Sequence, residues 1–162
     1  GADVVARVLY KKTWITEGQP FTDQTSVGLH LAQGAVDAIA HTVVNSPSEV
    51  SGPEFVFSRP ITEAITLRGL LPEMEIEALE LRVEGVLPNG SRRPLLLIRD
   101  PDPGWPTRYW FDTPQLLPSG SEIQVTATLR RGADRESVPS LFSSDAPIRL
   151  LVDYTSGAAA AN

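Results

Sequence analysis

Three glutamates alternate with other residues in the segment 73–77, and carboxylates at this spacing can do chemistry. Glu73, Glu75 and Glu77 are each separated by one residue, so on a β-strand they share one face with about 7 Å between neighbouring Cα atoms. Such a face could offer oxygen ligands to calcium, or two carboxyl groups for hydrolysis of a glycosidic bond. No Asp/Asn-Gly calcium loop accompanies the three glutamates, so a solvated strand face is the favoured interpretation.

Other residues that commonly form catalytic or metal sites are sparse. The two histidines, His30 and His41, do not have the spacing of a shared metal site. The chain has no cysteine, which excludes disulfides, cysteine-ligated zinc, iron–sulfur clusters and thiol nucleophiles. It also has no G-x-S-x-G elbow, and no serine has an evident histidine and aspartate partner. The residues alone do not complete a catalytic site, and the balance is against an enzyme.

The densest aromatic stretch runs from Gly104 to Phe111 and contains Trp105, Tyr109 and Trp110. Exposed aromatic rings could stack on sugar rings, which would make these three residues the ligand surface of a carbohydrate-binding module. Aromatic side chains more often fill the core of a β-sandwich. On a strand, Tyr109 and Phe111 face one way and Trp110 the other. We therefore expect at least one side of this stretch to be buried in the core, with the sugar-binding surface as the alternative.

Signals for β-strands dominate the rest of the chain. The predicted strands are 4–12, 27–31, 61–70, 73–86, 95–98, 108–112, 123–129 and 148–154, and the best helix candidate is the short segment 32–40. Many short strands separated by turns that contain proline and glycine are typical of sandwiches and jelly rolls. The sequence therefore predicts an all-β fold, an antiparallel β-sandwich of jelly-roll type with eight or more strands.

Two local patterns refine this prediction. The pair Asn89-Gly90 indicates a hairpin with a type I′ turn after the strand 73–86. Within that strand the apolar residues change parity, which predicts a β-bulge or a change of sheet. The first set is Met74, Ile76 and Ala78, and the second is Leu79, Leu81 and Val83.

Length and charge bound the remaining possibilities. The 162 residues predict one domain over 1–156, followed by a disordered tail of small residues at 157–162. The chain has 14 basic and 20 acidic residues, a net charge of −6, which argues against a nucleic-acid partner. No apolar run approaches the roughly 20 residues of a membrane span, so membrane insertion is not expected.

Several short motifs also follow one another in an informative order. They are Leu71-Pro72-Glu73-Met74-Glu75-Ile76, Leu87-Pro88-Asn89-Gly90, Trp105, Tyr109, Leu117-Pro118-Ser119-Gly120 and Leu150-Leu151-Val152-Asp153-Tyr154. In this order they resemble the C-terminal domain of the copper type II ascorbate-dependent monooxygenases, the peptidylglycine α-hydroxylating monooxygenase-like family, and its bacterial members in particular. The resemblance covers about residues 5–155. It implies a β-sandwich of jelly-roll type, which in the family carries copper. It also implies that Trp105 and Tyr109 are buried and structural, because the corresponding family residues help to pack the sandwich.

The resemblance also implies where the copper ligands would lie. Two family histidines fall at Glu73 and Glu75, a methionine falls at Pro147 or a neighbour, and the histidine of a His-Tyr pair falls at Leu9. Carboxylates are hard ligands that suit Cu(I) poorly. We therefore expect degenerate ligand positions at these four residues, with no copper and no other cofactor.

The favoured hypothesis is a non-catalytic binding or interaction module, exported to the periplasm or the extracellular space, whose partner is an unidentified protein or small ligand. One alternative is an oxidoreductase with an altered metal site at Glu73 and Glu75. The other is the carbohydrate-binding module formed by Trp105, Tyr109 and Trp110.

Overall fold

The computed structural model describes Val8, Tyr10 and the ranges 12–20, 22–28, 38–50, 52–130 and 145–157. The chain divides into two compact units, Gly1–Ala35 and Val36–Asn162, and each is described by itself. The predicted domain boundaries, 1–156, stay a prediction. Residues 158–162 of the predicted tail lie outside the described residues.

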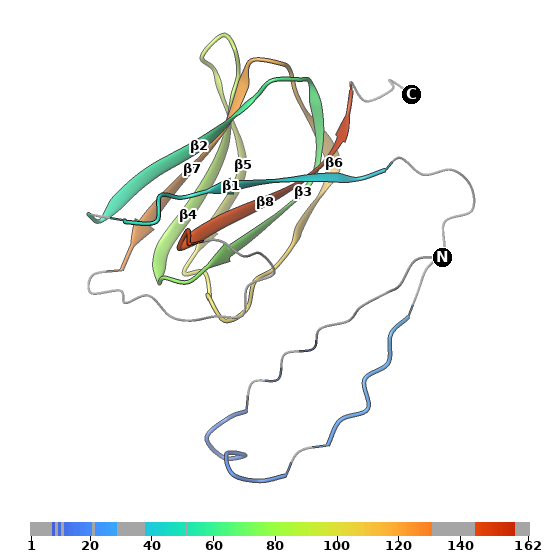
Figure 1. Cartoon of the computed structure of the whole chain (residues 1–162), viewed down its shortest axis with the longest axis vertical. Coiled ribbons are helices and arrows are strands. Elements are labelled where there is room, and N and C mark those ends of the chain that lie inside the picture. Colours follow the sequence, from blue (N-terminus) through green and yellow to red (C-terminus); the bar gives the residue numbers. More distant parts are fainter. Residues whose placement is uncertain are drawn as a thin grey trace. The chain divides into compact units, whose positions relative to one another are not determined.

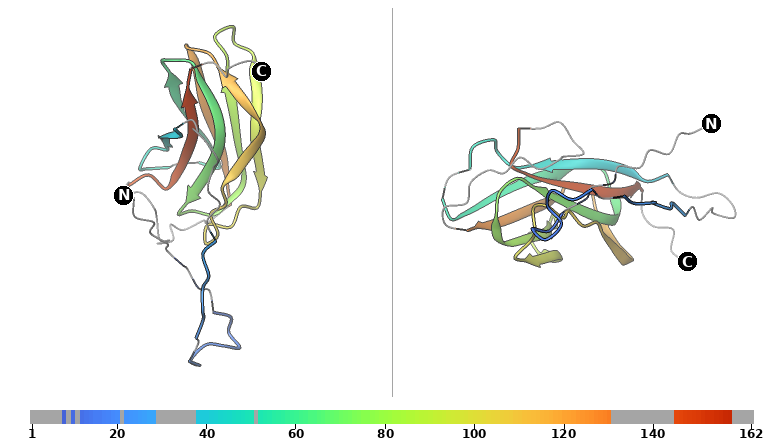
Figure 2. Two further views of the ribbon diagram at one scale, coloured as in Figure 1. Left: turned by 90° about the vertical axis from the view of Figure 1, so that its right-hand side faces the viewer. Right: turned by 90° about the horizontal axis from the view of Figure 1, so that it is seen from below.

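The second unit is built from two antiparallel four-stranded sheets (Figure 1). The first sheet contains, in spatial order, β1 (Ala40–Asn45), β8 (Ile148–Ser156), β3 (Ile65–Met74) and β6 (Tyr109–Leu117). The second contains β2 (Glu54–Ile61), β7 (Ser121–Leu129), β4 (Ala78–Val86) and β5 (Arg92–Arg99). Figure 2 shows the strands of the sandwich side by side in the left-hand view. The predicted all-β, antiparallel sandwich with at least eight strands is confirmed.

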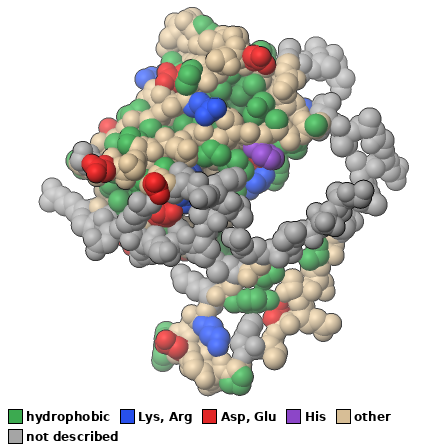
Figure 3. Space-filling model, viewed as in Figure 1, with side chains coloured by type: hydrophobic (Ala, Val, Ile, Leu, Met, Phe, Trp, Pro, Cys, Tyr) green, Lys and Arg blue, Asp and Glu red, His purple; other side chains and the backbone are tan. Residues whose placement is uncertain are grey.

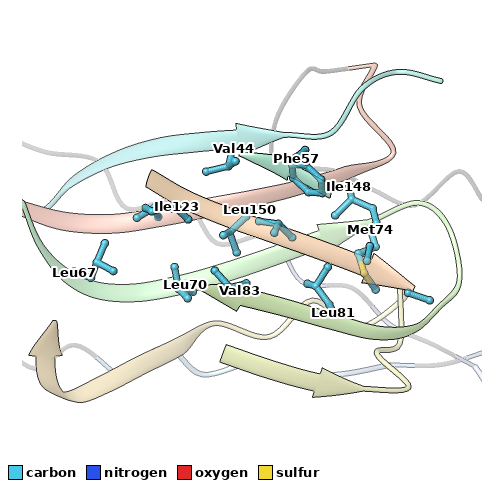
Figure 4. Close-up of a cluster of buried hydrophobic side chains, with 14 of the residues drawn as sticks. Val44, Phe57, Leu67, Leu70, Met74, Leu81, Val83, Ile123, Ile148 and Leu150 are labelled. Carbon is cyan, nitrogen blue, oxygen red and sulfur yellow. The ribbon is translucent and has the colours of Figure 1, made fainter. Parts of the chain in front are cut away.

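Apolar side chains from both sheets meet in one core (Figure 4). The predicted alternation on β7 is confirmed, because Ile123, Val125 and Ala127 are fully buried while the residues between them are only partly buried. Leu81 of β4 and Leu150 of β8 are likewise fully buried in this cluster. Apolar side chains at every second position of the strands therefore face the other sheet, and their packing holds the two sheets together.

The prediction of one strand over 73–86 is wrong. The strand β3 ends at Met74 and β4 begins at Ala78, and these two strands belong to different sheets. The change of parity in the sequence therefore marks a change of sheet, which was one of its two predicted meanings. Met74 and Ala78 are both buried in the core, because the connection between them lets each strand turn its apolar face inward.

The hairpin between β4 and β5 is confirmed, but its turn is not of type I′. Gly90 N–H donates to the Leu87 carbonyl (2.8 Å), and Leu87 N–H donates to the Ser91 carbonyl (2.9 Å). Gly90 has a φ of 81° while Asn89 does not have a positive φ. These bonds and angles describe a type I turn followed by a glycine bulge. The Asn89 side chain accepts from Ser91 N–H at 3.0 Å instead of adopting the left-handed conformation.

The first unit contains no strand among its described residues. The predicted strands 4–12 and 27–31 are therefore wrong at the residues that the structure describes. The other residues of these two segments lie outside the described part, and so does most of the helix candidate 32–40.

Two hydrogen bonds join residues of the first unit to Asp23. The Tyr10 hydroxyl donates to Asp23 Oδ2 at 2.5 Å, and Thr25 donates to the same atom at 2.6 Å. Hydrogen bonds from Thr25 and then from Tyr10 lower the pKa of Asp23, because they stabilise its charged form.

Candidate functional site

Glu73 and Glu75 lie where the end of β3 meets the start of β8. Glu73 pairs with Arg149 in the ladder between these strands, and Glu75 N–H donates to the Pro147 carbonyl at 2.8 Å. The Glu73 residue is only 4% exposed and Arg149 only 1%. The expectation of a solvated glutamate face is therefore wrong for Glu73.

The guanidinium of Arg149 lies between the two carboxylates. Its Nε is 3.4 Å from Glu73 Oε2, and its Nη2 is 2.8 Å from Glu75 Oε1. Its Nη1 donates to the Ala146 carbonyl at 3.0 Å. We name Glu73, Glu75, Ala146 and Arg149 the arginine cage. Glu77, the third glutamate of the segment, stands apart, because it is half exposed and lies 3.1 Å from Arg130 Nε.

The arginine cage does not fit the copper that the family resemblance implies. Copper of this type needs imidazole and thioether donors, whereas the cage offers two carboxylates and a carbonyl around a cation that belongs to the chain. Met74 is buried in the hydrophobic core. Leu9 lies outside the described residues. Within the described ranges, no group of three histidines, aspartates or glutamates could hold a metal ion.

The described histidine, His41, lies on β1 with an exposed imidazole, while His30 lies outside the described residues. Hydrophobic side chains are interspersed with polar groups over the face of the molecule in Figure 3. The Nδ1 atom of His41 is 3.6 Å from Oδ1 of Asp153, and the Asp153 side chain is fully buried. Asp153 Oδ2 accepts from Arg108 Nη1 at 2.9 Å. The Arg108 guanidinium lies 5.5 Å from the centre of the Trp110 ring. The structure thus links His41 to the aromatic stretch, which the sequence did not suggest.

A hollow of about 280 Å³ opens between the end of β3 and the loop 100–108 that joins β5 to β6. We name it the tryptophan pocket. Its lining includes Met74, Asp100, Asp102, Trp105, Thr107 and Tyr109. Three prolines of the same loop, Pro101, Pro103 and Pro106, complete much of its wall. The pocket thus combines aromatic and apolar walls with two carboxylates, the Arg99 side chain and a hydroxyl, which is the usual composition of a small-ligand site.

The prediction that Trp105 is buried is wrong, because this residue is 65% exposed. It lies in the connecting loop instead of on a strand. The loop is folded on itself by Asp102, whose side chain accepts from Gly104 N–H at 2.8 Å and whose carbonyl accepts from Trp105 N–H at 3.1 Å. Tyr109 is partly buried, while Trp110 is 56% exposed. The structure therefore brings Trp105 and Tyr109 together in the pocket, with Trp110 facing elsewhere.

Two features of these sites were missed from the sequence. Arg149 is a single charged residue in the apolar run Ile148–Val152, and a charge in such a run is the signal that could have indicated a buried ion pair. Asp100, at the start of the pocket loop, has a φ of 46°, and no local sequence pattern indicated this positive angle.

Comparison with known proteins leaves these sites to be interpreted on their own geometry. No family model matches the chain, and neither a curated protein nor a solved structure is significantly similar to it. Among the residues that the structure describes, no helix is long and apolar enough to cross a membrane.

Proposed function

We propose that this protein is a non-catalytic carbohydrate-binding module whose ligand stacks on Trp105 in the tryptophan pocket. The observation that carries the proposal is the exposed indole of Trp105, held at the rim of a hollow by a proline-rich loop. A large aromatic ring that is exposed to water contributes little to the hydrophobic core. It offers a flat apolar face, and the C–H face of a sugar ring is a flat apolar surface of similar size.

The polar groups of the pocket favour a sugar over other ligands with flat apolar faces. Asp100 and Asp102 supply carboxylate oxygens, and Thr107 supplies a hydroxyl. Carboxylates accept strong hydrogen bonds from hydroxyl donors, and sugars carry hydroxyls around the rim of the ring. In the lining two carboxylates, Asp100 and Asp102, stand against the single positive charge of Arg99, so a neutral oligosaccharide is favoured over an acidic one.

The loop geometry limits the entropic cost of binding. Three prolines fix backbone angles in the loop, and the turn at Asp102 fixes the position of Trp105. A surface that is ordered before the ligand arrives loses less conformational entropy on binding. This supports a binding role for the loop instead of a connecting role alone.

A relation to the copper type II monooxygenases stays part of this proposal, with a jelly-roll fold and export to the periplasm or beyond. It is supported by the order of the sequence motifs and by the position of the arginine cage, in which Glu73, Glu75 and Ala146 surround one cation. On this hypothesis the scaffold was retained and copper chemistry was lost. The alternative of an oxidoreductase with a metal at Glu73 and Glu75 is disfavoured, because the Arg149 guanidinium already lies between the two carboxylates.

The test is a titration of the protein with neutral hexasaccharides, using cellohexaose, xylohexaose and mannohexaose as probes. We expect the wild type to bind one of them and to change its tryptophan fluorescence. The Trp105→Ala variant should weaken this binding about tenfold or more, through loss of the stacking surface. The matched control is Trp14→Ala, because Trp14 is also highly exposed but belongs to the first unit.

Stability measurements separate this proposal from a structural role of Trp105. Trp105→Ala should change the free energy of unfolding by less than about 1 kcal/mol, whereas a core tryptophan would cost about 3–5 kcal/mol. Failure of the wild type to bind any probe, or equal binding by Trp105→Ala, would contradict the sugar ligand. Binding of a decaproline peptide that depends on Trp105 would instead assign the pocket to proline-rich segments.

A further inference from the structure

A second hollow adjoins the tryptophan pocket. It has a volume of about 440 Å³, and its lining consists of Glu77, Ala78, Arg130 and the loop residues 100–103. We name it the Arg130 hollow. The same four loop residues also line the tryptophan pocket. The two hollows therefore meet along this stretch of the loop, so a chain of linked sugar units that leaves the first can enter the second.

The guanidinium of Arg130 is fixed between two carboxylates of the Arg130 hollow. Its Nε lies 3.1 Å from Glu77 Oε2 and its Nη2 lies 2.9 Å from Asp100 Oδ1. The Arg130 side chain is half exposed. A guanidinium carries five N–H groups, and these two contacts leave others that can donate to a ligand. The position of this donor is thus set before a ligand arrives, which lowers the entropic cost of binding.

Donors and acceptors stand side by side in the Arg130 hollow, and this arrangement matches the hydroxyls of a sugar. An ionised carboxylate only accepts hydrogen bonds and a guanidinium only donates them, whereas a hydroxyl does both. Two neighbouring hydroxyls can therefore accept from Arg130 and donate to Glu77 or Asp100 at the same time. The lining that the structure describes contains no aromatic residue, so a sugar unit here is bound by its hydroxyls instead of by stacking.

The backbone at Asp100 gives this carboxylate its place in both hollows. Asp100 has a φ of 46°, and its N–H donates to the Leu79 carbonyl at 2.9 Å. Aspartate tolerates this left-handed conformation, but glycine would adopt it without steric cost. What aspartate adds at this position is a carboxylate, which lines the tryptophan pocket and the Arg130 hollow together.

We propose that the Arg130 hollow is a second subsite for the same neutral oligosaccharide, in which Arg130, Glu77 and Asp100 bind hydroxyls of the sugar units that follow those in the tryptophan pocket. The stacking on Trp105 then supplies the apolar contact, and the Arg130 hollow supplies the polar contacts further along the sugar chain. A disaccharide fills only the tryptophan pocket, so longer oligosaccharides bind more tightly. This inference rests on the proposed function, because it extends the ligand that stacks on Trp105.

The experiment compares whichever of cellohexaose, xylohexaose and mannohexaose binds the wild type with cellobiose, xylobiose or mannobiose of the same linkage. Calorimetry measures the tighter complexes, and NMR titration measures the weaker ones. We expect the wild type to bind the hexasaccharide about tenfold or more tightly than the disaccharide. Arg130→Met should weaken hexasaccharide binding about tenfold, through loss of hydrogen bonds from a charged donor, and leave the disaccharide affinity unchanged.

Arg82→Met is the matched control. The Arg82 side chain is 51% exposed and lies 2.7 Å from Glu80, so it resembles Arg130 in exposure and in having a carboxylate partner. It lies in the lining of neither hollow. Both sugar affinities should therefore stay unchanged in this variant, and a loss of hexasaccharide affinity as large as that of Arg130→Met would overturn the proposal.

Other outcomes separate the second subsite from the proposed function. Equal affinities of the wild type for the two sugars, with binding still lost in Trp105→Ala, would overturn the second subsite and leave the proposed function in place. An unchanged hexasaccharide affinity in Arg130→Met would do the same. So would an equal loss of both affinities in this variant, because Arg130 would then act by positioning Asp100 in the tryptophan pocket. If the wild type binds none of the sugars, the proposed function fails and the second subsite fails with it.

Discussion

Gly69 of β3 lies directly beneath the ring of Trp110 on the neighbouring strand β6. The two residues are opposite each other in the ladder, just after a β-bulge at residues 67–69. A Cβ atom added to Gly69 would lie 2.8 Å from Cε3 of Trp110 and 3.1 Å from the Tyr109 carbonyl oxygen. The missing side chain therefore lets the indole lie flat on the sheet, where Arg108 reaches over it to Asp153.

We predict that Gly69→Ala destabilises the protein by about 1–3 kcal/mol, because the indole must move to make room for the new methyl group. In a Trp110→Ala background the cost should fall, since the main obstacle has gone. A double-mutant cycle from urea unfolding measures this coupling. Gly28→Ala is the control, because no atom lies within 4 Å of a Cβ there. Equal costs of Gly69→Ala in both backgrounds would contradict the close approach.

At the scale of residues, the sequence indicated which side chains could bind or react better than it indicated how buried they are and which residues contact them. The aromatic stretch was recognised, but whether Trp105 points into the core or into water depends on how Asp102 folds the loop. The glutamates were recognised too, but their partner Arg149 comes from a strand far along the chain. Burial of Glu73 follows from the register of β3 with β8, and register is not visible in one strand alone.

At the scale of elements, the β4–β5 hairpin depends on one backbone angle. Gly90 has a φ of 81°, and open space surrounds the position of its missing Cβ atom. Substitution there meets no steric obstacle from other residues, so any cost comes from the backbone conformation alone.

Gly90→Val should therefore lower the free energy of unfolding by roughly 1 kcal/mol or more, since a β-branched side chain disfavours positive φ. Gly90→Asn should cost less, because asparagine tolerates the left-handed region. Thermal and urea unfolding of both variants measure the difference. An equal Tm for the two variants would show that the turn does not need a left-handed residue at this position.

The sequence predicted strand interiors well and strand ends poorly. The alternation on β7 and the apolar β8 were visible because burial imposes a period of two. The break after Met74 was predicted only as a bulge or a change of sheet, because both produce the same change of parity. The structure distinguishes them: Glu75 N–H bonds to Pro147 outside the ladder of β3 with β8, and Ala78 joins the other sheet.

At the scale of the whole sandwich, an arginine bridges the two sheets on each open side. Arg59 of the edge strand β2 donates to the carbonyl of Val43 on β1 at 3.3 Å. Arg93 of the edge strand β5 donates to the carbonyl of Leu116 on β6 at 2.8 Å. Each bond occupies an edge carbonyl that could otherwise pair with another chain. The two arginines therefore link the layers and protect the edges of the first sheet.

Replacing these arginines by methionine keeps the apolar stem and removes the bridge. We expect Arg93→Met to lower the free energy of unfolding by about 1 kcal/mol and Arg59→Met by less, because the Arg59 bond is longer and charged donors contribute most at short distance. The bridged strands β1 and β6 are three strand spacings apart, about 14 Å, so the double variant should show the sum of the two effects. Urea unfolding measures all three variants.

Arg99→Met is the control, since Arg99 lies 4.0 Å from Glu80 within one sheet and is highly exposed. If Arg93→Met is no more destabilising than Arg99→Met, the bridge contributes nothing to holding the layers together.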